Sequence, residues 1–226
     1  MSTRRRLSIF DVVGPVMIGP SSSHTAGAAR LGKLARQLLA EQPRCARCTL
    51  YGSLAATYRG HGTDLALIGG LLGFDPDDER IRSSAELAEA EDLQVELIAS
   101  QDNAGLLHPN LVRIELSGDT RQVSLVGASV GGGKVEVLEL NGFPVRLRCE
   151  EYTLVVSSWD QPGVVTELTR YLTQAGANIG NMSVSRLGRG KSVVMTIELD
   201  AEPSADTLER LRAVSGVNRI ICLQKL

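Results

Sequence analysis

The stretch TLVVSSWDQPGVVTELTRYLTQAG, residues 153–176, decides the fold of the C-terminal part of the chain. Its first six residues have the β-branched content of a buried strand, and Pro162 and Gly163 then mark a turn. Apolar residues follow at the spacing of one helix face. Gly176 ends that helix, because glycine readily adopts a positive φ. The stretch therefore predicts a strand, a turn and an amphipathic helix.

The segments that follow complete this part of the chain. Residues 178–187 and 192–199 have the pattern of two strands, a second amphipathic helix covers 205–214, and a last strand covers 217–223. The order β-α-β-β-α-β is the ferredoxin-like pattern. Half of the sheet surface in that fold is usually left uncovered by its own helices, so we expect this part to associate with a partner.

Residues 147–152 form a boundary between this part and a longer N-terminal part. We therefore predict two domains, 1–149 and 152–226. The N-terminal part mixes helical and strand patterns, so we expect an α+β fold there, without a defined topology. Ser53 and Thr63 are expected at helix cap positions. Helices are expected at 31–39, 53–59, 64–72 and 79–91, and strands at 94–99, 111–117, 121–126 and 134–140.

Composition narrows the class of protein. The 226 residues are 43% hydrophobic and 22% charged, which is ordinary for a soluble globular protein. The net charge of −2 offers no basic field, which argues against nucleic-acid binding. No run reaches the ~18–20 apolar residues of a membrane helix, so we expect no membrane partner.

The N-terminus and the cysteines indicate a cytoplasmic protein. Three arginines precede an apolar run over residues 7–19, but Asp11 and Pro15 interrupt it and no small-residue cleavage site follows. We therefore expect no signal peptide. The four cysteines are too few and too scattered to cross-link a chain of this length, which favours reduced thiols in the cytoplasm.

The three histidines lie among small or turn-forming residues, in SSSHT, GHGTD and LHPN. Histidine titrates near neutral pH, and small neighbours let backbone amides and a ligand approach closely. The alternative interpretation is that all three are solvated loop residues.

The run Gly19–Thr25 directly precedes a predicted helix. A helix start has unpaired N–H groups and partial positive charge, so the hydroxyls of Ser21, Ser22, Ser23 and Thr25 beside His24 predict a site for a carboxylate or phosphate. The alternative is simple capping, for which one serine would suffice.

The second histidine, His61, stands between two glycines at another predicted helix start. Asp64 could orient its imidazole or merely complement the helix N-terminus. The third segment, His108-Pro109-Asn110, has the pattern of an ordinary turn.

Two other motifs do not meet the requirements of the sites they suggest. Gly131-Gly132-Gly133-Lys134 leads into a strand, so it lacks the helix of a phosphate loop, and we expect a tight turn. The dipeptide Asn141-Gly142, by contrast, predicts a β-hairpin turn.

The second motif is the CxxC of Cys45 and Cys48, near the expected end of a helix. It lacks the further ligands of a zinc or iron–sulfur site. We therefore expect no metal ligands in this chain.

Together, the segments VVGPVMIGPSSSHTAGAARLG, YGSLAATYRGHGTDLALIGGLLGF, HPN and SVGGGKVEVLELNGF resemble the beta chain of the iron–sulfur-dependent L-serine dehydratases. The resemblance runs from about Phe10 to the C-terminus. Residues 152–226, with DQPGVV and NIGNMSVSR, resemble an ACT domain, an amino-acid-sensing module. The sequence departs from the family pattern at one position: the family has threonine after HPN, whereas this chain has Leu111.

The resemblance implies the conversion of L-serine to pyruvate and ammonia. It also implies a [4Fe-4S] cluster whose cysteine ligands belong to a separate alpha chain. In this chain it makes His61 the leading candidate for the base, with Asp64 and His24 as further catalytic residues. It also implies that the glycine-flanked His61 lies beside the hydroxyl-lined site of residues 21–25. The residues implied to bind substrate are Ser21, Ser22, Ser23, Thr25, Thr63, His108 and Asn110.

The ACT resemblance implies a regulatory site and self-association. Such domains usually bind amino acids at a dimer interface, here at Asp160, Pro162, Gly163, Asn178 and Ile179. Serine or a related amino acid would bind there, or the domain only dimerises. The N-terminal part also resembles the regulatory domain of some phosphoglycerate dehydrogenases, so the rival hypothesis is a non-catalytic amino-acid sensor that controls a partner enzyme.

Overall fold

The computed structural model describes residues 14–102 and 108–226, and its contacts divide the chain into two compact units, Met1–Asn141 and Gly142–Leu226. The three arginines and most of the apolar run rejected as a signal peptide lie outside the described residues. In the part of the chain that the structure describes, no helix is long and apolar enough to span a membrane.

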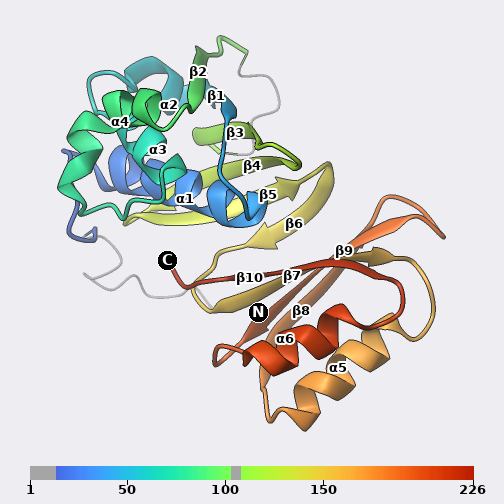
Figure 1. Cartoon of the computed structure of the whole chain (residues 1–226). Coiled ribbons are helices and arrows are strands. Elements are labelled where there is room, and N and C mark those ends of the chain that lie inside the picture. The colour runs from blue at the N-terminus through green and yellow to red at the C-terminus, as the bar shows by residue number, and fades with distance from the viewer. Residues whose placement is uncertain (1–13, 103–107) are drawn as a thin grey trace, which may run out of the picture. The chain divides into compact units, whose positions relative to one another are not determined.

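The first unit is built on a mixed sheet in the order β2-β1-β3-β4-β5 (Figure 1). β1 pairs with β2 in parallel, and the other neighbours are antiparallel. The strands are β1 (Cys45–Tyr51), β2 (Gln94–Ala99), β3 (Asn110–Ser117), β4 (Gln122–Gly131) and β5 (Lys134–Leu140).

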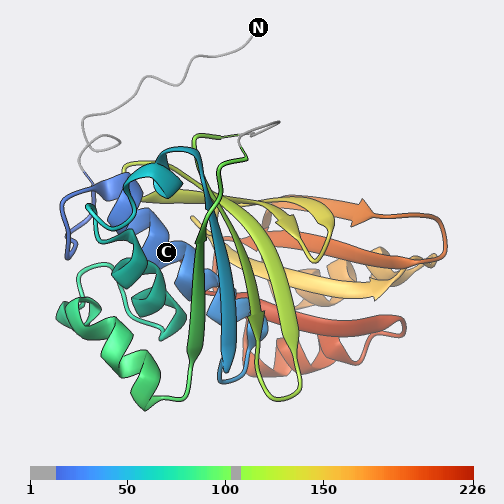
Figure 2. The same ribbon diagram turned by 90° about the horizontal axis from the view of Figure 1, so that it is seen from above.

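Helices cover one face of this sheet, as Figure 2 shows. α1 (Gly27–Leu39) and α3 (Thr63–Leu71) pack against each other, and α1 packs on β3 and β4. The predicted apolar face of α1 forms the centre of the core, because Leu31, Leu34 and Leu38 are at most 1% exposed. The two shorter helices are α2 (Gly52–Thr57) and α4 (Ser84–Ala90).

Several expected elements of this unit require correction. Residues 79–91 begin as a 3-10 turn (Glu79–Ser83) before α4, so the expected continuous helix is wrong. The N-cap residues of α2 and α3 are Tyr51 and Gly62, so neither Ser53 nor Thr63 is a cap. Ser53 lies inside α2, where its hydroxyl is available to another partner.

The CxxC segment lies on a strand and not near the end of a helix. Cys45 is exposed and Cys48 is fully buried, following the alternation of β1. Strand residues three apart point to opposite faces. The two thiols therefore cannot act on one metal ion or form one dithiol pair.

The two glycine turns are as predicted. Gly131, Gly132 and Gly133 have φ values of 100°, 59° and 75° and connect β4 to β5. Asn141 and Gly142 have φ values of 50° and 82°, which suits a type I′ hairpin.

The second unit confirms the predicted ferredoxin-like order. Its sheet has the order β10-β7-β9-β8 with all neighbours antiparallel. Leu154, Leu168 and Ile197 are fully buried in a core between this sheet and its two helices. A short strand, β6 (Phe143–Leu147), precedes the domain. The other elements are β7 (Tyr152–Trp159), α5 (Val164–Gln174), β8 (Ile179–Arg186), β9 (Ser192–Leu199), α6 (Ala205–Arg212) and β10 (Val217–Leu223).

Candidate functional site

The serine-rich run forms the first turn of a long helix. Residues Ser22–Ala26 make a π-helical turn that continues directly into α1. Ser21 is its N-cap, and the Ser21 Oγ accepts a hydrogen bond from the His24 amide at 3.2 Å. The approach to this turn needs Gly19, whose φ is 139° and whose added Cβ would lie 2.4 Å from Thr25 Cγ2. The sequence thus places a helix start, several hydroxyls and His24 at one point.

The imidazole of His24 contacts hydroxyl groups at both nitrogens. Its Nδ1 lies 3.0 Å from Ser23 Oγ and 3.3 Å from Ser21 Oγ. Its Nε2 lies 3.0 Å from the Oγ of Ser53 on α2. A hydroxyl can donate or accept, so these partners suit either neutral tautomer.

His61 lies in the loop between α2 and α3, and its Nδ1 lies 3.3 Å from the Thr57 carbonyl oxygen. A carbonyl only accepts hydrogen bonds, so this contact places the proton of neutral His61 on Nδ1. The lone pair is then on Nε2, which has no hydrogen-bond partner among the described residues. This is the tautomer that a base acting through Nε2 requires.

The two histidines form one pair. Their ring centroids are 4.9 Å apart, with 34° between the ring planes. Burial is the main cause that lowers the pKa of His24 below 6.5, the nearby His61 lowers it further, and the Ser53 backbone opposes the shift. The neutral form of His24 is therefore favoured beside His61.

The threonines and Asp64 have other contacts. The Thr25 Oγ1 donates to the His61 carbonyl at 3.0 Å, and Thr25 is 1% exposed. Thr63 is fully buried, and its Oγ1 has no hydrogen-bond partner in the described ranges. Asp64 accepts from the Leu65 amide at 2.9 Å, while the Thr57 carbonyl takes the His61 Nδ1 contact expected of Asp64. A ligand could reach either threonine only if the segments around it moved.

The third histidine segment holds α2 in place through its backbone. The Ser53 amide donates to the Pro109 carbonyl at 2.8 Å, and Gly52 forms a bridge with Asn110 at the start of β3. The His108 Nδ1 accepts from the Asn110 amide at 3.1 Å, which closes a local turn. The structure thus links all three histidine motifs.

Ser53 and Thr57 are functional candidates that sequence reasoning missed. Both lie within the quoted segment YGSLAAT, but nothing in its pattern indicates a contact with a histidine 29 positions away. Ser53 and Thr57 are spaced four residues apart, but this spacing occurs in every helix and so does not indicate a functional role.

The cysteines of this chain do not form a cluster site. Burial raises the pKa of Cys48 and of Cys149 to about 12, which keeps both as thiols at neutral pH. No group of three histidine, cysteine or acidic side chains that could hold a metal ion occurs within residues 14–102 and 108–226. These residues do not fit a [4Fe-4S] cluster, which needs several thiolates at one place.

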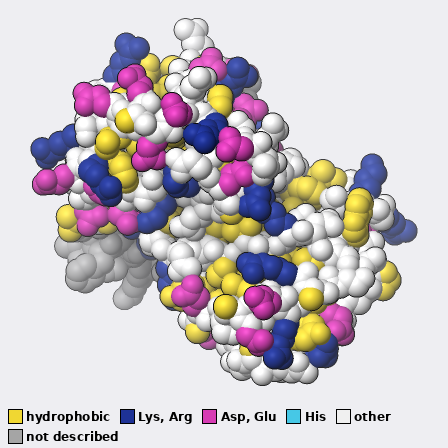
Figure 3. All heavy atoms as spheres, viewed as in Figure 1, with side chains coloured by type: hydrophobic (Ala, Val, Ile, Leu, Met, Phe, Trp, Pro, Cys, Tyr) yellow, Lys and Arg dark blue, Asp and Glu magenta, His cyan; other side chains and the backbone are white. Residues whose placement is uncertain are grey.

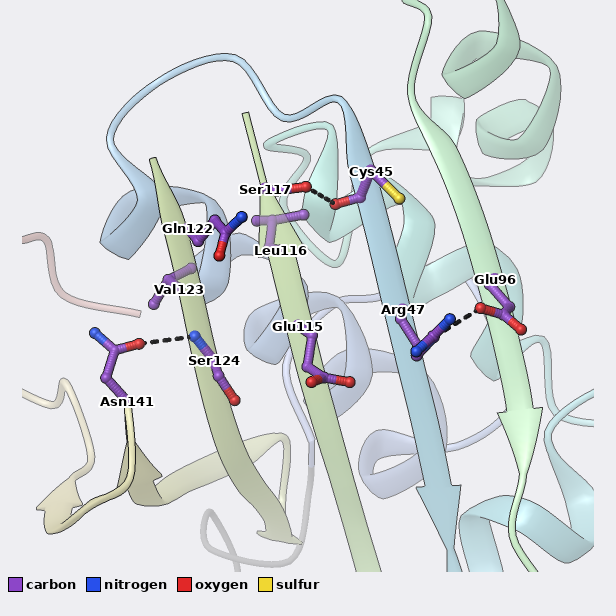
Figure 4. A pocket seen from close by; sticks show the side chains of 10 residues that line it. All are labelled: Cys45, Arg47, Glu96, Glu115, Leu116, Ser117, Gln122, Val123, Ser124 and Asn141. Atoms are coloured by element: carbon purple, nitrogen blue, oxygen red, sulfur yellow. Dashed lines mark hydrogen bonds and ion pairs between the residues drawn. The ribbon is translucent and has the colours of Figure 1, made fainter. Parts of the chain in front are cut away.

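A cavity of about 370 Å³ lies on the exposed sheet surface of the first unit (Figure 4). Arg47 and Glu96 form an ion pair at 2.8 Å along its wall, and Glu115 stands beside Arg47 in the strand register. No histidine lines this cavity. On the face that Figure 3 shows, acidic and basic side chains are interspersed, without a broad area of one sign.

The expected regulatory residues lie at two ends of one sheet. Asp160 accepts from the Gly190 amide at 3.0 Å, and Pro162 and Gly163 lead into α5. Asn178 donates to Asp200 at 2.7 Å. At the start of β8, Ile179 pairs with the end of β9. Asp160 follows Trp159, and Trp159 pairs with the start of β9.

An eight-residue strand spans roughly 25 Å at about 3.3 Å per residue. One copy of the chain therefore does not bring Asp160, Pro162 and Gly163 together with Asn178 and Ile179.

Comparison with known proteins identifies both parts of the chain. The family model described as "Serine dehydratase beta chain" matches residues 8–139, and the model described as "ACT domain" matches residues 152–216. The "Probable L-serine dehydratase, beta chain" of Bacillus subtilis is 42% identical over 94% of this chain and 96% of its own length. The "L-serine dehydratase, beta chain" of Peptoniphilus asaccharolyticus is 37% identical over 94% of each chain.

A more distant similarity concerns a different enzyme. The "D-3-phosphoglycerate dehydrogenase" of Synechocystis is 24% identical over 84% of this chain but only 34% of its own length. Both stronger relatives are matched nearly end to end, and the first family model alone covers more than half of the chain. The chain therefore belongs to the serine dehydratase beta-chain family and is a subunit of an enzyme of that family.

Proposed function

We propose that this chain is the beta subunit of an iron–sulfur-dependent L-serine ammonia-lyase, which converts L-serine to pyruvate and ammonia. The observation that carries the proposal is the contact between His24 and His61 at a helix start lined with serine hydroxyls. A [4Fe-4S] cluster, held by cysteines of an alpha chain, would supply Lewis acidity toward the substrate hydroxyl. This chain supplies groups for the carboxylate and the α-proton.

His61 is the proposed base. Removal of the weakly acidic α-proton of serine needs a neutral base close to the carbon that bears it. The Thr57 carbonyl leaves the His61 lone pair on Nε2, and the neutral His24 beside it does not repel an incoming proton. We propose that the Thr57 carbonyl orients this imidazole, while Asp64 accepts a hydrogen bond from the Leu65 amide in the first turn of α3.

The substrate carboxylate binds at the helix start. The first N–H groups of a helix have no acceptor within it, and the aligned peptide dipoles favour a negative charge there. The hydroxyls of Ser21, Ser22 and Ser23 supply further donors, and each of these residues is partly exposed. His108 and Asn110 support this site through α2.

The decisive experiment is anaerobic co-expression with the alpha chain, followed by a pyruvate assay. We expect His61→Asn to reduce turnover by about 10²–10⁴-fold, the usual contribution of a positioned base, and to leave the subunit complex assembled. Glu89→Gln, an exposed change on α4, is the control and should keep full activity. Activity of His61→Asn close to that of the unchanged enzyme would contradict the proposal.

The second candidate function is a non-catalytic amino-acid sensor that controls a partner enzyme. The similarity to a phosphoglycerate dehydrogenase over 84% of the chain favours it. In that case His61→Asn would leave turnover intact and change only its response to an amino acid. The same reconstituted complex therefore separates the two functions.

For the ACT domain we propose self-association, with serine or a related amino acid bound between copies. The opposite placement of the Asp160 turn and Asn178 supports two copies, because each could offer a different end of its sheet. Calorimetry of the full chain with L-serine, compared with Asp160→Asn, tests this. If Asp160→Asn does not alter the heat of binding, the ligand binds elsewhere. If no heat is released, the domain dimerises without binding serine.

The free thiols are consistent with the cytoplasm, where we propose that the enzyme works.

A further inference from the structure

Ser53 is the residue outside the histidine motifs that contacts the pair most directly. Its Oγ lies 3.0 Å from His24 Nε2, the nitrogen opposite the one that faces Ser21 and Ser23. Without Ser53, every hydrogen bond that the described residues make to the ring would come from one side. Ser53 therefore decides whether the His24 imidazole is held at one nitrogen or at both.

The backbone of Ser53 is fixed on both sides. Its amide donates to the Pro109 carbonyl at 2.8 Å, and its carbonyl accepts from Thr57 Oγ1 at 2.8 Å. The preceding Gly52 has a φ of 56°, and an added Cβ there would lie 2.4 Å from the Pro109 oxygen. The hydroxyl of Ser53 thus extends from a backbone with little freedom to shift.

The short helix α2 contacts both imidazoles, through its residues Ser53 and Thr57. The Ser53 hydroxyl contacts His24 Nε2, and the Thr57 carbonyl contacts His61 Nδ1. A single short element therefore contacts both rings.

The hydroxyl of Ser53 can serve His24 in each neutral state. It donates when Nε2 is bare and accepts when Nε2 carries the proton, whereas a water molecule in its place would not be tethered. We propose, resting on the proposed function, that Ser53 is a positioning residue, whose hydroxyl holds the His24 imidazole beside His61 for proton abstraction from serine. A ring held in this way stays stationary next to the base.

The first test is kinetic and uses the reconstituted enzyme. We expect Ser53→Ala to lower kcat by about 10–100-fold, a fraction of the 10²–10⁴-fold usual for a base, with KM for L-serine changed less than kcat. Ser53→Thr keeps the hydroxyl and should recover most of the lost turnover. Ser117→Ala, on β3 away from the histidines, is the matched control and should behave as the unchanged enzyme.

Three kinetic results would overturn the proposal. These are an unchanged kcat in Ser53→Ala, a loss confined to KM, and a Ser53→Thr variant as slow as Ser53→Ala. The first would make the contact irrelevant to turnover, the second would assign Ser53 to substrate binding, and the third would assign the loss to packing.

A second test does not depend on catalysis. Ring-¹⁵N NMR of the histidine-labelled full chain reports which nitrogen of each imidazole carries the proton. We expect Ser53→Ala to shift the His24 ring resonances and to leave those of His108 unchanged, and identical His24 spectra would overturn the proposal. If the His24 resonances shift but His61→Asn remains active, the proposed function fails while the positioning contact stands.

Discussion

The Oγ1 of Thr25 donates a hydrogen bond of 3.0 Å to the backbone carbonyl of His61. This bond joins the π-helical turn that precedes α1 to the loop that carries the second imidazole, across 36 positions of sequence. Because Thr25 is 1% exposed, the bond is shielded from water. It is one of the contacts that hold the two histidine segments together, beside those made by α2.

Removing this bond should destabilise the protein and slow the enzyme. Thr25→Val preserves shape but leaves the His61 carbonyl without its donor, which costs roughly 1–3 kcal/mol for a buried group. We expect a lower denaturant midpoint and a reduced kcat in the reconstituted enzyme. Thr25→Ser keeps the donor and is the control. Equal midpoints for Thr25→Val and the unchanged chain would show that the bond contributes nothing.

The turn at Gly52 should tolerate no side chain. Gly52→Ala introduces both a left-handed alanine and a Cβ 2.4 Å from the Pro109 oxygen. Gly142→Ala also has a positive φ, 82°, but meets nothing within 4 Å. We expect Gly142→Ala to cost about 1 kcal/mol from strain alone, and Gly52→Ala to cost more and to disturb the histidine pair. Chemical unfolding measures both, and similar losses would contradict the close approach.

Stability should fall in mild acid through His24. Its pKa in the folded chain is below the ordinary value of 6.5, mainly because of burial. The unfolded chain therefore binds a proton more readily, so the contribution is complete above pH 6.5 and declines as pH falls toward the folded pKa. We expect His24→Gln to reduce the difference in Tm between pH 7.5 and pH 5.5. An identical difference in both proteins would locate the acid sensitivity elsewhere.

The two thiols of the CxxC segment should react at different rates. Burial holds the pKa of Cys48 at about 12, and its side chain is inaccessible, whereas Cys45 is exposed. At pH 8 we expect iodoacetamide to label Cys45 in the folded chain and Cys48 only after denaturation. Peptide mass spectrometry measures each site. Equal labelling of the folded chain would mean that β1 opens readily.

The parts of the fold that sequence predicts are those with a strong local signal. The β-branched run at 153–158 and the apolar face of the following helix correspond to β7 and α5 within a residue or two. Glycine turns at 131–133 and 141–142 were equally clear, since their positive φ values favour glycine or asparagine.

The parts that escaped prediction depend on contacts distant in sequence. The strand CARCTLY has Cys45 and Arg47 at its exposed positions, and it becomes a strand through pairing with β2 and β3. The expectation that His61 lies beside the hydroxyl-lined run agrees with the structure, but nothing in the two motifs indicates that Thr25 and α2 make the joining contacts. Serine is common at helix caps, which favours that role for Ser53 in the sequence, but its partner His24 lies in another motif.

The short length of α2, six residues, affects the stage of folding at which its contacts to the two histidines can form. A helix this short does not persist alone in water, since isolated helices below about 12–15 residues are marginal. Its conformation depends on the bridge between Gly52 and Asn110, which exists only after β3 has joined the sheet. A chain in which β3 has not joined the sheet therefore lacks the α2 contacts to both imidazoles, and with them the arrangement proposed for catalysis.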